Sequence, residues 1–167
     1  MVSVFDRIEP YFQDAVVAGV RDLRTGEVWS AERGKGTRYT HMDGTVVVKT
    51  SGITEVDKKT HVLFDHYGTP EAGIYNKIHK LAWGKDLGSN GFGLCCVSDG
   101  VFDAFVGPLN PWEAGAGYLL VTEAGGWFGN FGGVPYGDVR FEYVKGRLPT
   151  IAAATAELGK KLVALLK

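Results

Sequence analysis

Residues 111–126, with the sequence PWEAGAGYLLVTEAGG, constrain the fold of this chain more than any other segment. Pro111 suits the first position of a helix, because the amide hydrogen that proline lacks has no partner there. An apolar run follows, and Gly125-Gly126 supplies the left-handed backbone conformation at which helices commonly end. We therefore expect one helix that begins at Pro111 and stops at Gly125-Gly126.

The remaining sequence predicts strands first and an alternation of helices and strands afterwards. Its 167 residues suit a single domain, 1–167. Residues 1–64 should be mostly β-strands, with Asp43-Gly44 as a strong hairpin signal. Residues 70–167 should alternate between helices and strands. We expect helices after Pro70, from the N-cap Ser89 to Gly100, and over 156–167. We expect strands at 101–107 and 151–155. The fold class is therefore α/β, with mixed α+β layers.

Charge and hydropathy exclude several classes of protein. Lys and Arg number 18 against 19 Asp and Glu, so the net charge is −1. A general nucleic-acid binder or a polybasic membrane-surface protein needs a concentration of positive charge. Apolar runs are far shorter than the ~20 residues that span a bilayer, and no signal-peptide pattern opens the chain. We expect no nucleic acid, no membrane and a cytoplasmic location.

Cysteine and histidine offer little support for a metal or nucleophile site. Cys95 and Cys96 are adjacent within an apolar run, which predicts a reduced packing pair rather than a disulfide or a zinc site. His61, Asp65 and His66 could hold a metal, but their spacing is more typical of polar residues in a surface loop. Neither a dinucleotide fingerprint nor a P-loop nor a nucleophile elbow occurs.

The helix segment also resembles a known family signature. Trp112, the small residues 114–117, the apolar run 118–121 and the Glu-Ala-Gly-Gly at 123–126 are similar to the second signature of the inositol monophosphatase-like sugar-phosphatase family. Flanking segments extend the resemblance over about 14–167. They are a Gly-Ser helix start at 87–107, a Glu-Arg-Gly-Lys-Gly element within 16–36, and a closing strand and helix. The resemblance implies an inositol monophosphatase/fructose-bisphosphatase-like fold that is truncated at its N-terminus.

The resemblance also implies Mg²⁺-dependent hydrolysis of phosphate esters, which requires several carboxylate ligands. Glu113 stands at the position of the family's Trp-Asp ligand, with a side chain longer by one C–C bond. The family's Asp-Pro-x-Asp-Gly-Thr motif is absent. Met42-Asp43-Gly44-Thr45 looks like its remnant but occupies the family's hairpin-turn position instead. The other interpretation of Glu113 is a first-turn helix carboxylate that faces the dipole.

For the substrate, the resemblance implies that Gly88, Ser89 and Asn90 line the sugar side of the pocket. Ser89 as a simple N-cap is the alternative. Val106 stands where inositol-specific members carry a substrate-binding glutamate, so the resemblance argues against inositol monophosphate as the substrate. Trp112 should pack in the core, and Glu123 should support its turn rather than catalyse.

Three hypotheses follow. The chain is the C-terminal portion of a phosphatase, inactive alone or dependent on a complementary chain that carries the missing metal motif. Alternatively, it is a non-catalytic protein that keeps the fold for ligand binding or assembly. In the third, the chain alone hydrolyses phosphate esters through Glu113, Asp86, Asp99 or Asp103. A sheet face without its N-terminal cover would be apolar, which predicts a homo-oligomer.

Overall fold

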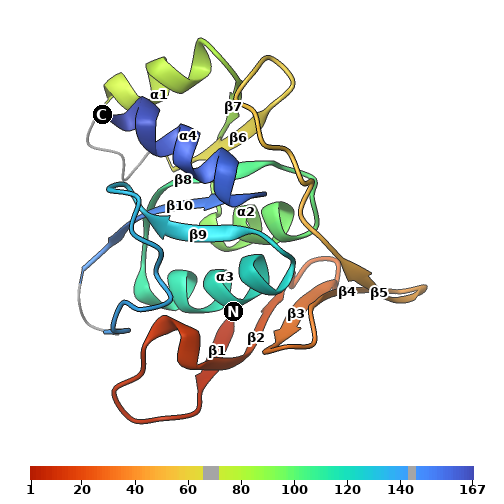
Figure 1. The fold of residues 1–167 in the computed structure, drawn as a ribbon. Coiled ribbons are helices and arrows are strands. Elements are labelled where there is room, and N and C mark those ends of the chain that lie inside the picture. Colours follow the sequence, from red (N-terminus) through yellow and green to blue (C-terminus); the bar gives the residue numbers. More distant parts are fainter. Residues whose placement is uncertain (66–71, 143–145) are drawn as a thin grey trace.

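The structure is a computed structural model that describes residues 1–65, 72–142 and 146–167. Within them, helices and sheets alternate in layers (Figure 1). A first sheet lies against the helices α2 and α3, a second sheet covers their other side, and α1 and α4 cover the outer face of that second sheet. Pro70, the expected start of a helix, lies outside the described residues.

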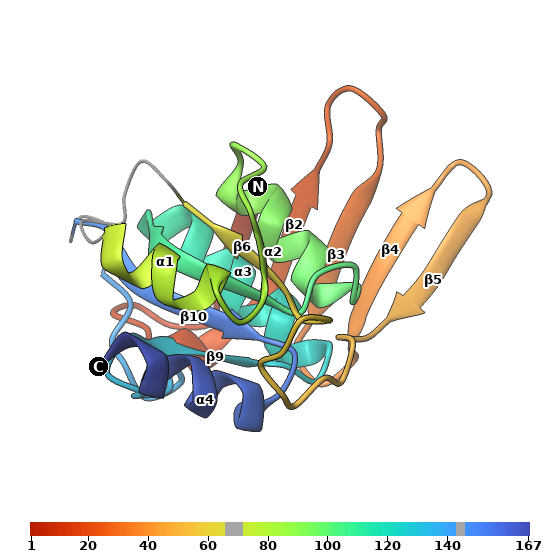
Figure 2. The same ribbon diagram turned by 90° about the horizontal axis from the view of Figure 1, so that it is seen from above.

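The first sheet is an antiparallel meander whose strands pair in chain order. The predicted hairpin is formed by β4 and β5, but His41 lies opposite Gly44, so its two turn residues are Met42 and Asp43 rather than Asp43 and Gly44. The segment that looks like a metal motif is therefore a hairpin, which extends to one side of the molecule in Figure 2. The strands are β1 (Val2–Phe5), β2 (Ala15–Arg21), β3 (Val28–Glu32), β4 (Thr37–His41) and β5 (Gly44–Val48), with a short 3-10 helix at Phe12–Asp14.

The second sheet is mixed and has the strand order β7-β6-β8-β10-β9. β6 runs parallel to β7 and β8, and β10 runs antiparallel to β8 and β9. The strands of this sheet are β6 (His61–Phe64), β7 (Trp83–Lys85), β8 (Ala104–Leu109), β9 (Trp127–Asn130) and β10 (Leu148–Ala153). β7 and β1 are short strands that the sequence pattern does not predict.

The four helices of the described residues are α1 (Ala72–His79), α2 (Asn90–Ser98), α3 (Pro111–Glu123) and α4 (Ala156–Leu166). α3 begins at Pro111 as predicted and ends just before Gly125, which has a φ of 91°. The predicted N-cap of α2 is confirmed, because the Ser89 side chain accepts from the backbone of Phe92. None of these helices has the length and apolar content needed to cross a bilayer.

Within the described part of the chain, three groups of buried side chains hold the layers together. One fills the space between the first sheet and the helices α2 and α3, and includes Trp29, Cys95 and Leu120. A second lies between these helices and the second sheet, and the third lies under α1 and α4. Cys95 and Cys96 are buried free thiols, as predicted, and burial raises the pKa of both; that of Cys96 rises to about 12.

Candidate functional site

The candidate site lies at the edge of the second sheet where β6, β7 and β8 end side by side. Asp65 follows the last residue of β6, and Asp86 follows the last residue of β7. Leu148, the first residue of β10, pairs with Leu109 at the end of β8, so the preceding Arg147 also lies at this edge. Ligands of α/β proteins commonly bind beyond the carboxyl ends of such strands.

Two helices begin at the same edge, because α2 follows β7 and α3 follows β8. The first amides of a helix have no partner within the helix, and the helix dipole adds partial positive charge there. Gly88 enters α2 with a φ of 68°, a left-handed conformation that favours glycine, and its amide donates to Asp86 Oδ1 at 2.7 Å. Both helix starts therefore favour a negatively charged group.

A cavity of about 320 Å³ opens at this edge, and we call it the edge cavity. It brings together the four residues to which the sequence resemblance gives a substrate or metal role, from segments more than 20 residues apart. Val106 does not line it, because it is fully buried in β8 with the side chains under α1 and α4. The edge cavity is lined by Asp65, Asp86, Gly88, Ser89, Asn90, Glu113 and Arg147.

Asp65 is the most buried carboxylate of the edge cavity, with its side chain only 7% exposed. It forms an ion pair with Arg147 and accepts a hydrogen bond from Asn90 Nδ2 at 3.0 Å. A buried charge needs such partners. Gly107 of β8 makes room for it, because a Cβ there would lie 2.8 Å from the Cβ of Asp65. The prediction that Asp65 is a polar residue of a surface loop is therefore wrong. His66, which the same prediction includes, lies outside the described residues.

Glu113 is held at the start of α3 by a capping box. Its Oε2 accepts from the backbone amide of Asn110 at 2.7 Å and from Asn110 Nδ2 at 2.9 Å. This reciprocal pairing satisfies amides that the helix itself leaves unpaired. Glu113 thus has the first-turn helix role, and one of its carboxylate oxygens is already engaged. Metal binding by Glu113 stays a prediction.

The four carboxylates of the chain-alone hypothesis do not converge on one site. Asp86 and Glu113 share the edge cavity. Asp99 caps the opposite end of α2, where it accepts from Trp29 Nε1 at 2.8 Å and where burial raises its pKa. Asp103 precedes β8, and accepts from Ser51 Oγ at 2.5 Å and from the His61 amide at 2.7 Å. Across residues 1–65, 72–142 and 146–167, no three His, Cys, Asp or Glu side chains gather as a metal ion requires.

Glu123 and Trp112 also belong to the helix signature, and the structure confirms the predicted role of the first but not that of the second. Glu123 supports a turn, as predicted: its two carboxylate oxygens accept from the amides of Gly34 at 2.8 Å and Gly36 at 2.9 Å. Both glycines have a φ of 76°, so this carboxylate fixes a left-handed turn after β3. The prediction that Trp112 packs in the core is wrong, because Trp112 is 47% exposed at the start of α3.

Sequence reasoning missed Arg147 and the buried position of Asp65. The available signal was positional, since each charge directly flanks a strongly apolar strand, HVLF before Asp65 and LPTIAA after Arg147. Their pairing spans 82 residues of sequence, and no local pattern indicates which strands lie together.

The fold and this edge define an α/β protein whose edge cavity holds three carboxylates and one guanidinium. A sequence model of the Inositol monophosphatase family matches residues 10–166, and the chain belongs to this family. The solved structures that it resembles have the same fold. An inositol monophosphatase from Anabaena (Nostoc) is 22% identical with a TM-score of 0.74, and SuhB from Mycobacterium tuberculosis is 25% identical with a TM-score of 0.72.

These relatives are longer than this chain. The matches cover 91% of this chain but 61% of the Anabaena chain and 58% of the M. tuberculosis chain. A curated relative from Methanococcus maripaludis, described as a bifunctional NADP phosphatase/NAD kinase, is 26% identical over 117 residues. That match covers 68% of this chain and 21% of the relative.

The capping box makes a prediction about Glu113 that is independent of any ligand. Glu113→Ala removes the box, so the free energy of unfolding should fall by about 1 kcal/mol. Glu113→Gln keeps an acceptor at the same place and should unfold like the unchanged chain. Urea denaturation followed by circular dichroism measures both.

Glu157→Ala is the matched control, since Glu157 lies in the first turn of α4, which Thr155 caps. It should cost only the dipole interaction, about 0.3–1 kcal/mol at low ionic strength, and this cost should shrink when salt is added, whereas that of Glu113→Ala should persist. Equal destabilisation by Glu113→Gln and Glu113→Ala would contradict the capping role.

Proposed function

We propose that the edge cavity binds the phosphate group of a small phosphate ester, such as a sugar or inositol phosphate. One observation carries this proposal: Gly88-Ser89-Asn90 and Glu113, from two separate family motifs, line one cavity together with the guanidinium of Arg147. The starts of α2 and α3 direct the partial positive charge of two helix dipoles to the same place.

Arg147 would be the main cationic partner of the phosphate. A guanidinium carries five N–H donors in a planar fork, so it can keep its bond to Asp65 and still donate to a phosphate oxygen. Its side chain is 35% exposed, whereas that of Asp65 is 7% exposed. Asp65 would therefore act as a positioning residue that holds Arg147 and Asn90 at the cavity wall.

For the reaction, we propose phosphate-ester hydrolysis of the family's metal-dependent type, carried out only when further carboxylates join the site. The described carboxylates do not fit a cluster of Mg²⁺ ions. Oε2 of Glu113 is engaged by Asn110, Asp65 by Arg147 and Asn90, and Oδ1 of Asp86 by the Gly88 amide. Mg²⁺ requires oxygen ligands in near-octahedral geometry at about 2.1 Å. A complementary chain with the Asp-Pro-x-Asp-Gly-Thr motif would supply them.

The second candidate function is ligand binding without hydrolysis. The capping box of Glu113 and the ion pair of Asp65 favour it, because both give these carboxylates structural partners instead of leaving them open to a metal. The Methanococcus relative indicates that a nucleotide phosphate is a further ligand class to test. Binding and hydrolysis must therefore be measured separately.

Binding of a phosphate ester should depend on Arg147. Arg147→Ala should weaken the binding of inositol and sugar phosphates by at least about 10-fold, because a charge-assisted hydrogen bond contributes roughly 1.5–3 kcal/mol. Isothermal titration calorimetry of the chain against a panel of these esters measures the loss.

Arg140→Ala is the matched control, since Arg140 pairs with Glu9 away from the edge cavity. It should bind like the unchanged chain. Arg147→Lys keeps the positive charge and should bind with intermediate affinity. A folded Arg147→Ala variant with undiminished affinity would show that the phosphate binds elsewhere.

Hydrolysis is tested by phosphate release from the same panel in the presence of Mg²⁺. The isolated chain should release phosphate no faster than the buffer does, because its carboxylates have other partners. The control is Glu113→Gln, which preserves the capping box. If the chain alone releases phosphate and Glu113→Gln abolishes this release, the site does not need further carboxylates. That result would establish Glu113 as a metal ligand.

We also propose that the outer face of the first sheet associates with a second copy of the chain. Val4 and Val17 are cross-strand partners on this face, and they are 48% and 43% exposed. Val2, at 57% exposed, lies beside Val4 on the same strand face. Val47, at 65% exposed, lies on the same sheet face at the far strand, beyond Ser30 and Arg38. Exposed apolar sheet faces and free strand edges favour association.

The oligomeric state tests this association directly. At tens of micromolar, analytical ultracentrifugation should show a dimer or larger species, and Val17→Glu should shift it towards monomer. Met42→Glu is the control, because Met42 is 96% exposed at the tip of the β4–β5 hairpin. A chain that sediments as a monomer at that concentration would overturn the proposal.

A further inference from the structure

The strand β5 forms one edge of the first sheet, and its backbone is open along that edge. β5 pairs with β4, and no other strand of the described residues lies beyond it. The free edge ends at Lys49, since the turn after α2 approaches there: a Cβ on Gly100 would lie 3.0 Å from the Lys49 carbonyl oxygen. Figure 2 shows the β4–β5 hairpin reaching beyond the helices, so the edge before Lys49 is accessible to another chain.

β5 lacks the features that usually keep an edge strand from pairing with another chain. Such features are charged side chains, a proline or a very short strand. Gly44–Val48 has the sequence GTVVV, and its Val46 and Val47 are 49% and 65% exposed. By contrast, β7, at an edge of the second sheet, has three residues and ends in Lys85. β5 is therefore well suited to pair with a further strand.

The register of the hairpin determines which backbone groups of β5 point outward. His41 and Gly44 close the two-residue turn as a hydrogen-bonded pair, and such pairs alternate with non-hydrogen-bonded pairs along an antiparallel ladder. Thr45 and Thr40 are then a non-hydrogen-bonded pair, whose side chains approach closely, and their hydroxyl oxygens lie 2.9 Å apart. The amides and carbonyls of Thr45 and Val47 therefore point to the free edge.

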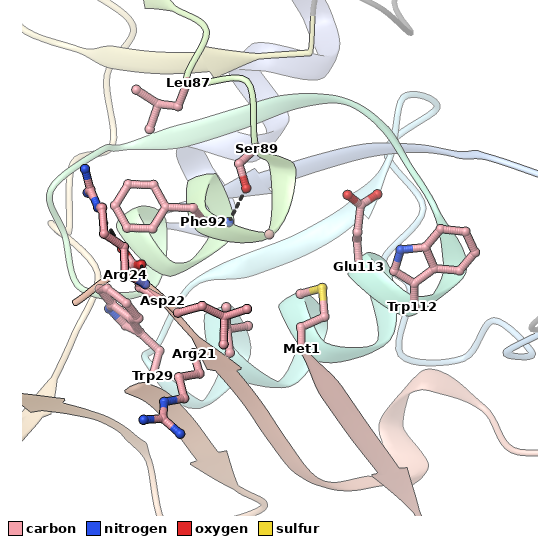
Figure 3. A pocket seen from close by; sticks show the side chains of 13 residues that line it. Met1, Arg21, Asp22, Arg24, Trp29, Leu87, Ser89, Phe92, Trp112 and Glu113 are labelled. Atoms are coloured by element: carbon pink, nitrogen blue, oxygen red, sulfur yellow. Dashed lines mark hydrogen bonds and ion pairs between the residues drawn. The ribbon is translucent and has the colours of Figure 1, made fainter. Parts of the chain in front are cut away.

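Aromatic contacts hold the hairpin to the rest of the protein. Trp29 of β3 lies in the wall of a second cavity, of about 670 Å³, where Figure 3 shows it near Phe92 of α2. The ring centroids of Trp29 and Phe92 are 5.7 Å apart, and those of Trp29 and Tyr39 of β4 are 4.8 Å apart. Tyr39 pairs with Val46, the middle residue of β5. The free edge is therefore preformed, so pairing requires little further ordering of the chain.

The charges that flank β5 are symmetric about Val46. Asp43 precedes Val46 by three residues, Lys49 follows it by three, and both are exposed. When two β5 strands pair antiparallel about Val46, Thr45 lies opposite Val47 of the second copy, which matches their outward backbone groups. The same register places Asp43 opposite Lys49 of the second copy, and two-fold symmetry repeats this pair. Opposite charges in such positions attract, so the strand is complementary to itself.

We propose that two copies of the chain join β5 to β5 in antiparallel orientation, so that their five-stranded sheets form one continuous sheet. The partner is a second copy because one register pairs both the open backbone groups and the flanking charges. This edge interface differs from the sheet-face association proposed above, which uses Val4 and Val17 on β1 and β2. It is also independent of the phosphate site. A chain that uses both interfaces forms species larger than a dimer.

Charge reversal tests the register of the edge interface. Asp43→Lys and Lys49→Glu each place like charges opposite one another at both ends of the paired strands. Each should weaken association about 10-fold, because two attractive cross-strand pairs become repulsive. The combined variant restores opposite charges and should associate like its parent. Analytical ultracentrifugation over a range of concentrations measures this in Val17→Glu chains, in which the sheet-face association is weakened throughout.

Mixing the two single variants makes the test stricter. In a mixed pair, the two lysines of the Asp43→Lys chain lie opposite the two acidic residues of the Lys49→Glu chain. An equimolar mixture should therefore associate more tightly than either variant alone. Asp43 and Lys49 lie at opposite ends of β5, so a contact within one chain cannot produce this result.

Lys160→Glu is the matched control, because it changes the net charge as Lys49→Glu does. Lys160 is exposed on α4, which covers the second sheet, so this variant should associate like its parent. Hydrogen exchange adds a backbone measurement. The amides of Thr45 and Val47 should exchange more slowly as the protein concentration rises, whereas that of Val46, which faces β4, should be protected at every concentration.

The contradicting outcomes concern the edge interface alone. Charge reversals without effect, or a combined variant that associates as weakly as each single variant, would overturn it and leave the sheet-face association standing. A Val17→Glu chain that stays monomeric up to hundreds of micromolar would overturn it as well. So would exchange of the Thr45 and Val47 amides that does not depend on concentration.

Discussion

The close approach of α2 and α3 is the constraint on which the site depends. A Cβ on Gly117 of α3 would lie 2.4 Å from Leu94 Cδ1 of α2, so only glycine allows this packing without displacing the Leu94 side chain. Both helices are enclosed between the two sheets, and they begin at the same sheet edge. Because they lie side by side, the Gly88–Asn90 segment and Glu113 meet across one cavity.

The second sheet supplies the charges of that cavity. Its parallel strands β6 and β8, with the antiparallel β10 beside them, bring Asp65 and Arg147 together although 82 residues separate them in the chain. The pair is costly to bury and is therefore held by further contacts, such as that of Asn90 with Asp65. We interpret the arrangement as a preorganised anion site, because the cation and two helix starts are fixed before any ligand arrives.

Local signals were sufficient for much of this fold. Pro111 and Gly125-Gly126 define the ends of α3, the Asp43-Gly44 signal indicates the β4–β5 hairpin to within one residue, and Ser89 caps α2, since each effect acts within a few residues. The family resemblance located Gly88–Asn90 and Glu113, and the structure places them around one cavity.

Other features depend on contacts that the sequence does not reveal. The exposure of Trp112 and the burial of Asp65 follow from which strands and helices become neighbours. The strands β1 and β7 have four and three residues, too few for a clear alternation of apolar and polar side chains. The role of Glu123 was predictable in kind, but its partners Gly34 and Gly36 lie almost 90 residues away.

The central claim is that two motif segments and Arg147 form one anion-binding cavity. A titration of the ¹⁵N-labelled chain with an inositol or sugar phosphate, followed by amide and Arg side-chain NMR signals, tests it most directly. The account predicts that the amides of Ser89, Asn90 and Gly91 and the Nε–Hε of Arg147 shift together, with one common affinity. Shifts confined to other surfaces, or an Arg147 signal that does not respond while the ligand binds, would contradict it.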